Sequence, residues 1–461
     1  MRFVYAIDER PLAVLFAAAI FATFFAHYFL GFTLLGGIDA QRVAVIAFSC
    51  LSAFFLLFKL SYRLVFLFFA VLFFAFLFRG FFMMNGYIKH ISYLLMLLPL
   101  LTVFYVLGTK VGGRFWEVGI SLCCIFSMLL VFVCAVAFKN SGVDFSWKEV
   151  FSYASHARFV NHFQVGIFLL LAFSVAEGSG WRRALCFFAL CALVFVVIVT
   201  AGRGIWLSML AGVAALYVLI EFAAFRRILI CLLGSGLLGF LLFEAFDRLF
   251  FEQKDVVGLA ARANVLVDNR TAIWLATVNA IFERPFLGYG AYSFAKGEGL
   301  PPSLPAHPHQ HFLQVAYEYG LPLAVSLYAL LVAFVVSLGR KIKKSRDVYS
   351  AVLLASFVAI VVNAQYSAVF TMPVGQVVGV VLAGLLLGRY SQVPLLGYSE
   401  VSRDRRLSLL ISCMSFLVAL SCAYWLATVE DYYRGLMGEE FELNFWHEKS
   451  RYLPRTWENA S

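Results

Sequence analysis

The stretch Val194-Phe-Val-Val-Ile-Val-Thr-Ala-Gly-Arg-Gly204 decides the fold, because an unbroken apolar run stops at a short polar turn and another apolar run follows at once. Apolar runs of about 17 to 25 residues, long enough to cross the hydrocarbon core of a bilayer, recur from residue 11 to residue 428. Hydrophobic residues make up 63% of the 461 residues and charged residues 13%, whereas soluble proteins contain about one half and about one quarter. The sequence therefore predicts an all-α polytopic membrane protein with about 12–13 transmembrane helices.

Basic residues fall on every second connection between the apolar runs, with the densest cluster at residues 340–346. The positive-inside rule places such connections in the cytoplasm, which puts the amino terminus inside and the segments 139–163, 200–204 and 247–317 outside. The net charge of +10 is explained by this topology, and no basic domain for nucleic acid is present. The expected organisation is about nine transmembrane helices over residues 1–246, a periplasmic catalytic loop over 247–317, further transmembrane helices over 318–428 and a polar tail over 429–461.

The long outer segment 247–317 contains one amphipathic stretch, from Arg270 to Phe282, whose apolar residues recur at helical spacing. This spacing predicts a short helix that starts near Arg270 and lies on the bundle or on the membrane surface. Pro285 ends the helix, and glycines and prolines then mark an irregular stretch. The next membrane helix is expected to start near His311 and to continue through Pro322.

Three imidazoles fall within five positions in His307-Pro-His-Gln-His311, just before that membrane helix. An imidazole has an ordinary pKa of about 6.5 and can take a proton from a hydroxyl at neutral pH, so His309 is a candidate general base. Two alternatives are that the cluster caps the following helix or lines a polar loop, and that it holds a metal ion. No acidic residue stands within the cluster, which disfavours the metal site.

Arg203 and Arg270 are two further candidates at the outer face. Arg203 ends an apolar run between two glycines that allow a ligand to approach closely, although it could instead anchor the helix among lipid headgroups. Arg270 alone could be a solvated surface charge, but two guanidinium groups beside a base suit a phosphate leaving group.

Several common cofactor and metal motifs are missing from the sequence. The outer loops hold no Asp-x-Asp pair, and the chain has no Walker loop and no Rossmann glycine fingerprint. All nine cysteines lie in apolar runs, which argues against disulfides and zinc sites. A transfer reaction without a metal or another cofactor is therefore expected.

Four short motifs resemble those of the superfamily that contains the O-antigen ligases, the O-antigen polymerases and the protein O-oligosaccharyltransferases. The segment Pro308-His-Gln-His-Phe-Leu-Gln-Val-Ala-Tyr-Glu-Tyr-Gly-Leu-Pro322 resembles the His-Asn-x-x-Leu and Glu-x-Gly block, with Gln310 in place of the family's Asn. Thr200-Ala-Gly-Arg-Gly204 resembles the Ser/Thr-x-x-Arg-Gly turn. Asn269-Arg-Thr-Ala-Ile-Trp274 with Arg284-Pro-Phe-Leu-Gly-Tyr-Gly290 resembles the Arg-x-x-x-Trp and Pro-x-x-Gly-x-Gly block, and Arg158-Phe-Val-Asn-His-Phe-Gln164 is similar to the Asn-rich connection.

The resemblance implies a glycosyltransferase of the GT-C type that takes a glycan from undecaprenyl pyrophosphate, without a metal and with inversion at the anomeric carbon. It also implies a multi-pass protein of the bacterial (Gram-negative) inner membrane whose active site faces the periplasm. By position in the motifs, His309 would be the base, with His311 and His307 as the alternatives in register, and Arg203 and Arg270 would bind the pyrophosphate. Further candidates for substrate binding are His311, Gln310, Arg158 and Asn161.

Within the superfamily, a compact chain with one dominant outer loop resembles the ligases most, which transfer O-antigen to a sugar of lipid A-core. The expected partners are then O-antigen linked to undecaprenyl pyrophosphate as donor, lipid A-core as acceptor, and membrane lipids. A polymerase and a protein O-oligosaccharyltransferase are the alternatives inside the superfamily. A transporter of lipid-linked glycans is the alternative outside it, but such proteins usually show internal repeats, and none is evident here.

Overall fold

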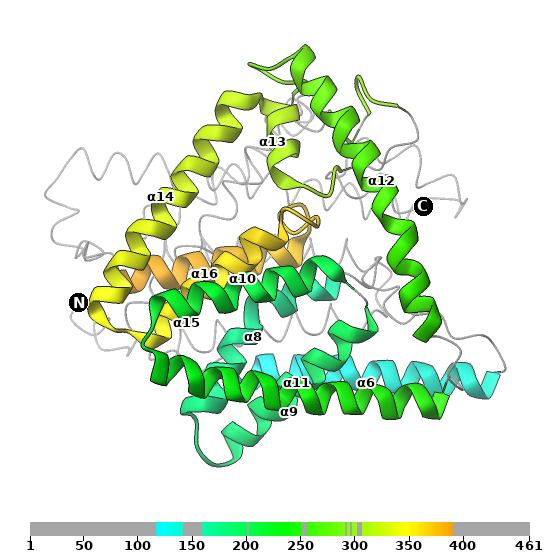
Figure 1. The fold of residues 1–461 in the computed structure, drawn as a ribbon, viewed down its shortest axis with the longest axis vertical. Helices are drawn as coiled ribbons and strands as arrows, with labels where there is room; N and C mark the ends of the chain where they lie inside the picture. The colour runs from blue at the N-terminus through cyan, green and yellow to red at the C-terminus, as the bar shows by residue number, and fades with distance from the viewer. Residues whose placement is uncertain are drawn as a thin grey trace, which may run out of the picture.

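The computed structural model describes residues 117–141, 159–200, 202–250, 256–290, 293–295, 297–301 and 307–390 (Figure 1). The helices in these ranges are α6 (Glu117–Ser141), α8 (Phe159–Glu177), α9 (Gly180–Val199), α10 (Arg203–Leu219), α11 (Phe222–Phe250), α12 (Val256–Glu283), α13 (His311–Tyr319), α14 (Leu321–Ser345), α15 (Val348–Asn363) and α16 (Pro373–Tyr390). Five of them, α6, α8, α9, α11 and α14, are long and apolar enough to cross a membrane, and α10, α15 and α16 are shorter apolar helices.

These helices confirm the predicted fold class, an all-α polytopic membrane protein. The spans predicted before residue 117 and after residue 390, and the tail 429–461, lie outside the described residues. The total of about 12–13 spans therefore stays a prediction.

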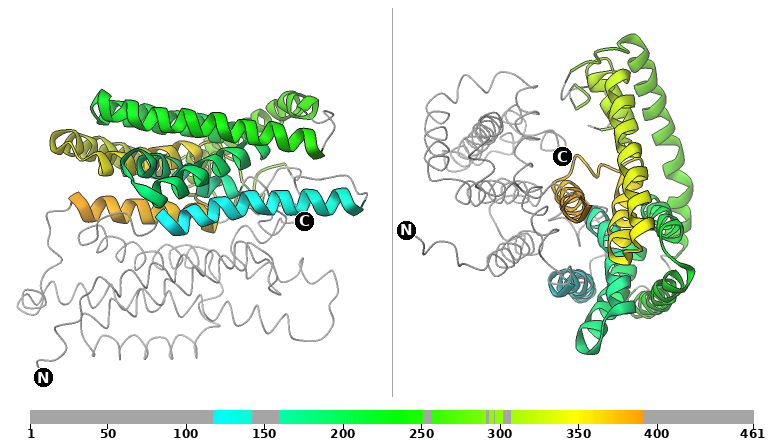
Figure 2. Two further views of the ribbon diagram at one scale, coloured as in Figure 1. Left: turned by 90° about the horizontal axis from the view of Figure 1, so that it is seen from below. Right: turned by 90° about the vertical axis from the view of Figure 1, so that its left-hand side faces the viewer.

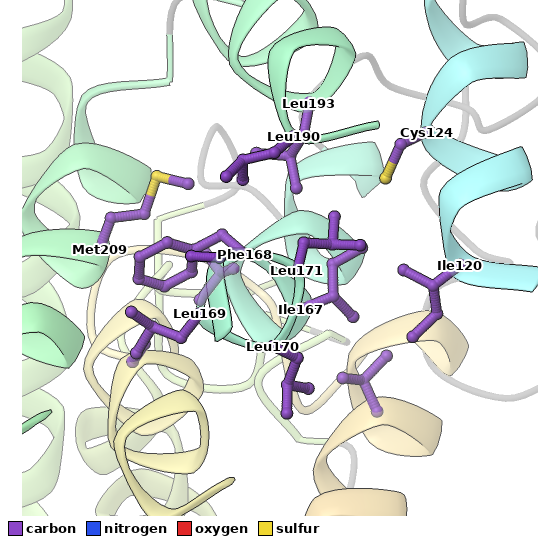
Figure 3. Close-up of a cluster of buried hydrophobic side chains, with 14 of the residues drawn as sticks. Ile120, Cys124, Ile167, Phe168, Leu169, Leu170, Leu171, Leu190, Leu193 and Met209 are labelled. Carbon is purple, nitrogen blue, oxygen red and sulfur yellow. The ribbon is translucent and has the colours of Figure 1, made fainter. Parts of the chain in front are cut away.

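Helix α8 is the centre of the bundle, where it lies among α6, α9, α10, α15 and α16 (Figure 3). After its polar first turns, its sequence is apolar on every side, as expected for a helix that is buried among its neighbours. Phe168 and Leu170 are buried in the same cluster as Ile120 of α6, Leu190 of α9 and Met209 of α10. This packing fixes both ends of α8 relative to its neighbours.

Helices α11 and α14 lie at the periphery of the described bundle (Figure 2). Their large apolar side chains are open to the surroundings: Leu237 of α11 is 62% exposed and Leu330 of α14 is 69% exposed. In a chain that crosses the membrane, such faces contact lipid, where apolar side chains are favoured.

Polar groups from distant segments meet at one end of the bundle. The start of α8 contacts the end of α9, through Asn161 and Thr200, and the turn after α15, through His162 and Ser367. The start of α13 joins the same turn, because the backbone N–H of His311 donates a hydrogen bond to the turn at 3.0 Å. These segments were predicted to share a compartment, and they do share one end of the bundle; that this end faces the periplasm stays a prediction.

The predicted start of the amphipathic helix was wrong, since α12 begins at Val256 and Arg270 lies well inside it. Asp268 and Asn269 are residues that often begin helices, which favoured a start beside them. However, the preceding stretch Leu259-Ala-Ala-Arg-Ala263 consists of strong helix formers, so the helix begins before these residues.

The predicted single helix from His311 through Pro322 is two helices, α13 and α14, that meet at Gly320. Gly320 has a φ of 89°, which interrupts the helical backbone. Pro322 lies in the first turn of α14, where a missing N–H breaks no helical hydrogen bond. The start near His311 is confirmed.

At the opposite end of α15, Asp347 joins this helix to α16. Its carboxylate accepts hydrogen bonds from the Ser350 hydroxyl at 2.6 Å and from Arg389 Nη2 at 2.7 Å. Burial by itself raises the pKa of Asp347, but these hydrogen bonds and the charge of Arg389 outweigh burial and lower the pKa below its ordinary value of 3.8. The far end of α15 is thereby fixed, while its other end carries the turn that supports α13.

Candidate active site

Asn161 of α8 holds the turn that carries Arg203. The hydroxyl of Thr200, the residue that caps α9, donates to Asn161 Oδ1 at 2.9 Å. Gly202 lies against the same amide, and a Cβ at this position would be only 2.6 Å from Asn161 Nδ2, so a larger residue does not fit. Arg203 is the first residue of α10 and is exposed. The turn therefore presents a guanidinium group together with the backbone N–H groups of a helix start, which favour anions.

The residue after Asn161 contacts a second turn. His162 is 1% exposed, and its Nε2 lies 2.8 Å from the hydroxyl of Ser367, in the turn between α15 and α16. The carbonyl of Ala364, at the start of the same turn, accepts the hydrogen bond from His311. Two adjacent residues of α8 thus contact both the turn that carries Arg203 and the turn on which α13 begins.

Helix α12 brings the second arginine to this end of the bundle. Burial, and after it the positive charge of Arg203, lowers the pKa of Arg270 from its ordinary value, so the two guanidinium groups share one region. One helical turn after Arg270, Trp274 Nε1 donates a hydrogen bond to the carbonyl of Pro308 at 2.9 Å. The arginine of this motif therefore lies one turn from the loop that carries the histidines.

The backbone of the histidine loop is unusual at His309. Among the described residues, His309 and Arg346 are the two non-glycine residues with positive φ, and His309 has a φ of 55°. The His309 N–H donates to His307 Nδ1 at 3.2 Å, and the two ring centroids are 4.0 Å apart. Gln310 then caps α13, because its side-chain oxygen accepts the N–H of Leu313. A residue held in the left-handed region often belongs to a functional site.

His311 takes part in a different set of hydrogen bonds. Its Nδ1 lies 2.9 Å from the hydroxyl of Tyr328 on α14. Gln365 Nε2 donates to the same hydroxyl at 2.8 Å and to the carbonyl of Val361 at 3.2 Å. These contacts join the start of α13 to α14 and to the end of α15.

The two glycine motifs contact each other through their backbones. Gly288 has a φ of 65°, and a Cβ there would lie 2.5 Å from the carbonyl oxygen of Tyr317. A Cβ on Gly320 would collide with the carbonyl oxygen of Phe286. Tyr289 N–H donates to the Tyr317 carbonyl at 2.9 Å. The Pro-x-x-Gly-x-Gly and Glu-x-Gly motifs therefore fasten the end of α12 to the end of α13.

The predicted site residues fall into three groups: those brought to one end of the bundle, those with a structural contact, and one outside the described residues. Arg203, Arg270 and His309 come from separate segments, and the contacts above bring these segments to one end of the bundle. Asn161 is 3% exposed and bonded to the Arg203 turn, and Gln310 serves as a helix cap, which was one alternative for the cluster. Arg158 lies outside the described residues.

Sequence reasoning missed Tyr328 and Gln365. Tyr328 is one aromatic residue in a long apolar run, so nothing in the sequence indicates its contact with His311. Gln365 follows Asn363 between two apolar runs, and this short polar stretch is a signal that could have been used. In the described ranges, no group of three or more His, Cys, Asp or Glu side chains could hold a metal ion, and the reaction without a metal stays a prediction.

Comparison with known proteins bears on the segment that holds these residues. Residues 186–328 match the family described as O-antigen ligase. The matched segment runs from α9 into α14 and includes Arg203, Arg270 and His309. No curated protein and no solved structure matches the chain. The match confirms the resemblance seen in the motifs, and residues 186–328 are consistent with an O-antigen ligase-like protein of the ligase and polymerase superfamily of membrane glycosyltransferases.

Proposed function

We propose that this protein is an O-antigen ligase of the bacterial inner membrane. It transfers O-antigen polysaccharide from undecaprenyl pyrophosphate to a sugar of lipid A-core at the periplasmic face. The observation that carries the proposal is that the segments of Arg203, Arg270 and the histidines meet at one end of the bundle, where Trp274, one helical turn after Arg270, bonds to the histidine loop. Two guanidinium groups in one region favour an anionic ligand between them.

The pyrophosphate of the donor is the anion that suits this pair. A guanidinium group presents a planar fork of donors that matches two phosphate oxygens at once. In the proposed site Arg203 and Arg270 bind the pyrophosphate, and the first N–H groups of α10 add to the same field. The charge that develops on the leaving group is thereby stabilised without a metal.

The hydrogen bonds of the loop favour His309 as the base. Because His307 Nδ1 accepts the N–H of His309, a neutral His307 carries its proton on Nε2. His311 Nδ1 lies 2.9 Å from the Tyr328 hydroxyl, so this nitrogen is also engaged in a contact within the protein. Together with the register of the motif and the left-handed backbone of His309, these contacts support His309 as the residue that accepts the substrate proton.

The reaction then proceeds as a single displacement. The acceptor hydroxyl oxygen attacks the anomeric carbon of the donor, the bond from that carbon to the pyrophosphate oxygen breaks, and His309 takes the hydroxyl proton. The configuration at the anomeric carbon is inverted. The products are the glycosylated acceptor, undecaprenyl pyrophosphate and a protonated imidazole that returns its proton to water.

Replacement of His309 by Asn tests the base, since Asn tolerates positive φ and preserves the loop backbone. In membrane vesicles with donor and acceptor, His309→Asn should abolish glycan transfer while the protein still binds the donor. His307→Asn, two residues away, is the matched control and should retain transfer. Normal transfer by His309→Asn would show that His309 is not the base.

The acceptor is tested in cells that lack this protein. A ligase predicts lipopolysaccharide with a bare core and polymer that accumulates on the undecaprenyl carrier. Core that bears single repeats would indicate a polymerase, and intact lipopolysaccharide with unmodified glycoproteins would indicate a protein O-oligosaccharyltransferase. Donor that accumulates on the cytoplasmic side would indicate a transporter.

A further inference from the structure

The end of α12 and the loop after it carry three large apolar side chains that the described protein leaves uncovered. Phe282, Phe286 and Leu287, here named the apolar tip, are 73%, 76% and 83% exposed. No other large apolar side chain in the described ranges is as exposed. These residues belong to the segment predicted to be a periplasmic loop, whose amphipathic helix was expected to lie on the bundle or on the membrane surface, and α12 is not one of the candidate membrane spans.

The backbone holds the apolar tip in this outward position. The carbonyl oxygen of Phe286 faces Gly320, and the carbonyl of Pro285 accepts the N–H of Leu321 at 2.7 Å. The inner side of the loop is thus occupied by the corner between α13 and α14. The side chains of Phe286 and Leu287 therefore point away from the protein.

The charged residues beside the apolar tip are engaged elsewhere. Arg284 lies over the ring of Tyr289, 4.6 Å from the centroid, and the Tyr289 hydroxyl donates to Glu283 at 2.6 Å. The side chains of Glu283 and Arg284 thus both contact Tyr289. A cation and a tyrosine therefore lie beside the three apolar side chains, a combination that is common at membrane interfaces.

The apolar tip continues the lipid-facing surface of α14. Leu321, the residue bonded to Pro285, is the first residue of this span, and Leu323 and Leu327 of its next turns are 52% and 44% exposed. The end of α12 and the start of α14 lie together, away from α8, α9 and α11 (Figure 1). An apolar surface that begins on a membrane span and extends onto its neighbouring loop has lipid as its natural neighbour.

We propose that the apolar tip inserts into the bilayer beside the start of α14 and anchors α12 to the membrane surface. Because the same backbone contacts fasten α12 to α13, the inserted tip also sets the height of the histidine loop relative to that leaflet. The insertion of the apolar tip does not depend on the reaction that the protein catalyses. Insertion can therefore be refuted while the proposed function holds, and the proposed function can be refuted while insertion holds.

Depth-dependent quenching tests the insertion in full-length protein reconstituted into phosphatidylcholine vesicles. A genetically encoded fluorescent amino acid replaces Phe286, with the same label at Leu330 as a lipid-facing reference and at Glu298 as an exposed polar reference. A spin label on the upper acyl chain should quench position 286 nearly as strongly as position 330. Iodide in the water should quench position 298 but have little effect on position 286.

A second measurement uses the unlabelled protein and so does not depend on the folding of a labelled variant. Lipids with a photoreactive diazirine in the acyl chain should crosslink to the peptide that contains the apolar tip. The double variant Phe286→Gln, Leu287→Gln should lose this crosslink and keep those on α14.

Two results would overturn the proposal. Strong iodide quenching at position 286 without lipid quenching would place the apolar tip in water. Protection from both quenchers, with no lipid crosslink, would mean that protein covers it, either a second copy of this chain or another partner.

Discussion

The Thr200→Val substitution is expected to reduce catalysis by displacing Arg203. The valine keeps the shape of the threonine but cannot donate to Asn161 Oδ1, 2.9 Å away. Both residues are buried, at 8% and 3% exposure, so water does not replace the lost donor. The substitution therefore removes the hydrogen bond by which Thr200 joins the turn to α8, although the Thr200 backbone bond within α9 remains.

The size of the effect follows from the burial of the amide oxygen. A buried acceptor that loses its donor costs about 1 to 3 kcal/mol. If the turn relieves this cost by moving away from Asn161, the equilibrium shifts by the same free energy toward a state in which Arg203 is displaced. This shift corresponds to roughly a 5- to 150-fold loss of the state in which Arg203 is in position to bind. The loss should appear mainly in donor affinity, since Arg203 is proposed to bind the pyrophosphate.

The assay compares Thr200→Val, Arg203→Ala and the double variant in glycan transfer by membrane vesicles. If Thr200 acts only through Arg203, the double variant should be no worse than Arg203→Ala. Thr277→Val is a matched control, because Thr277 is fully buried and its hydroxyl bonds only within α12 at 2.7 Å. This control should retain transfer.

Two results would refute the reasoning, and they point to different errors. Losses that multiply in the double variant would mean that Thr200 and its partner act on the substrate independently of Arg203. An Arg203→Ala variant with normal donor affinity would refute the proposed role of the arginine itself.

Three other substitutions test the surrounding structure. Gly320→Ala should destabilise the protein by at least about 3 kcal/mol in thermal unfolding, because the φ of 89° and a nearby backbone carbonyl both oppose a Cβ. Gly297→Ala is the control: its φ is 68°, but no atom lies within 4 Å of the added Cβ, so it should cost only about 1 to 2 kcal/mol. Asp347→Asn should lose about 1 to 3 kcal/mol at neutral pH. Since folding lowers the pKa of Asp347 below 3.8, this difference should be full above that pH and vanish as the pH falls through the lowered pKa, and equal losses at every pH would contradict it. Tyr328→Phe removes the contacts of this hydroxyl with His311 and Gln365 and so loosens the start of α13, which directly follows the loop that carries His309. Turnover should slow roughly 5-fold with unchanged donor affinity, and a change confined to donor affinity would contradict this.

Hydropathy was enough to predict the fold class, because each membrane span must be apolar over a fixed length. The break between α9 and α10 was also predictable, since Thr200, Gly202 and Arg203 interrupt an apolar run. The boundary between α13 and α14 was not, because the turn at Gly320 depends on a backbone contact with a loop about thirty residues earlier in the chain. Local sequence does not contain that contact.

The candidate site was predictable to a different degree. The motifs indicated Arg203, Arg270 and His309, since each is a reactive residue type at a recognisable position. The hydrogen bonds that fix His311 at the start of α13 were not predictable, because Tyr328 and Gln365 lie in or beside apolar runs and acquire their roles only when α13, α14 and α15 meet. Partners that meet across the fold have no fixed spacing in the sequence.

The contacts divide the motif positions into two kinds with different physical demands. Arg203, Arg270 and His309 are proposed to offer charge or a lone pair to a ligand, and a change there is expected to alter the chemistry. Trp274 and Gly320 hold backbones together, through a hydrogen bond to Pro308 and a contact too close for any Cβ. A base must stay within hydrogen-bond reach of the proton it removes, so a loop that carries one needs such fixed attachments. The spacing of Arg270 and Trp274, one helical turn apart, then has a physical reason: Trp274 positions the histidine loop, and Arg270 lies in the same region, where it is proposed to bind the donor.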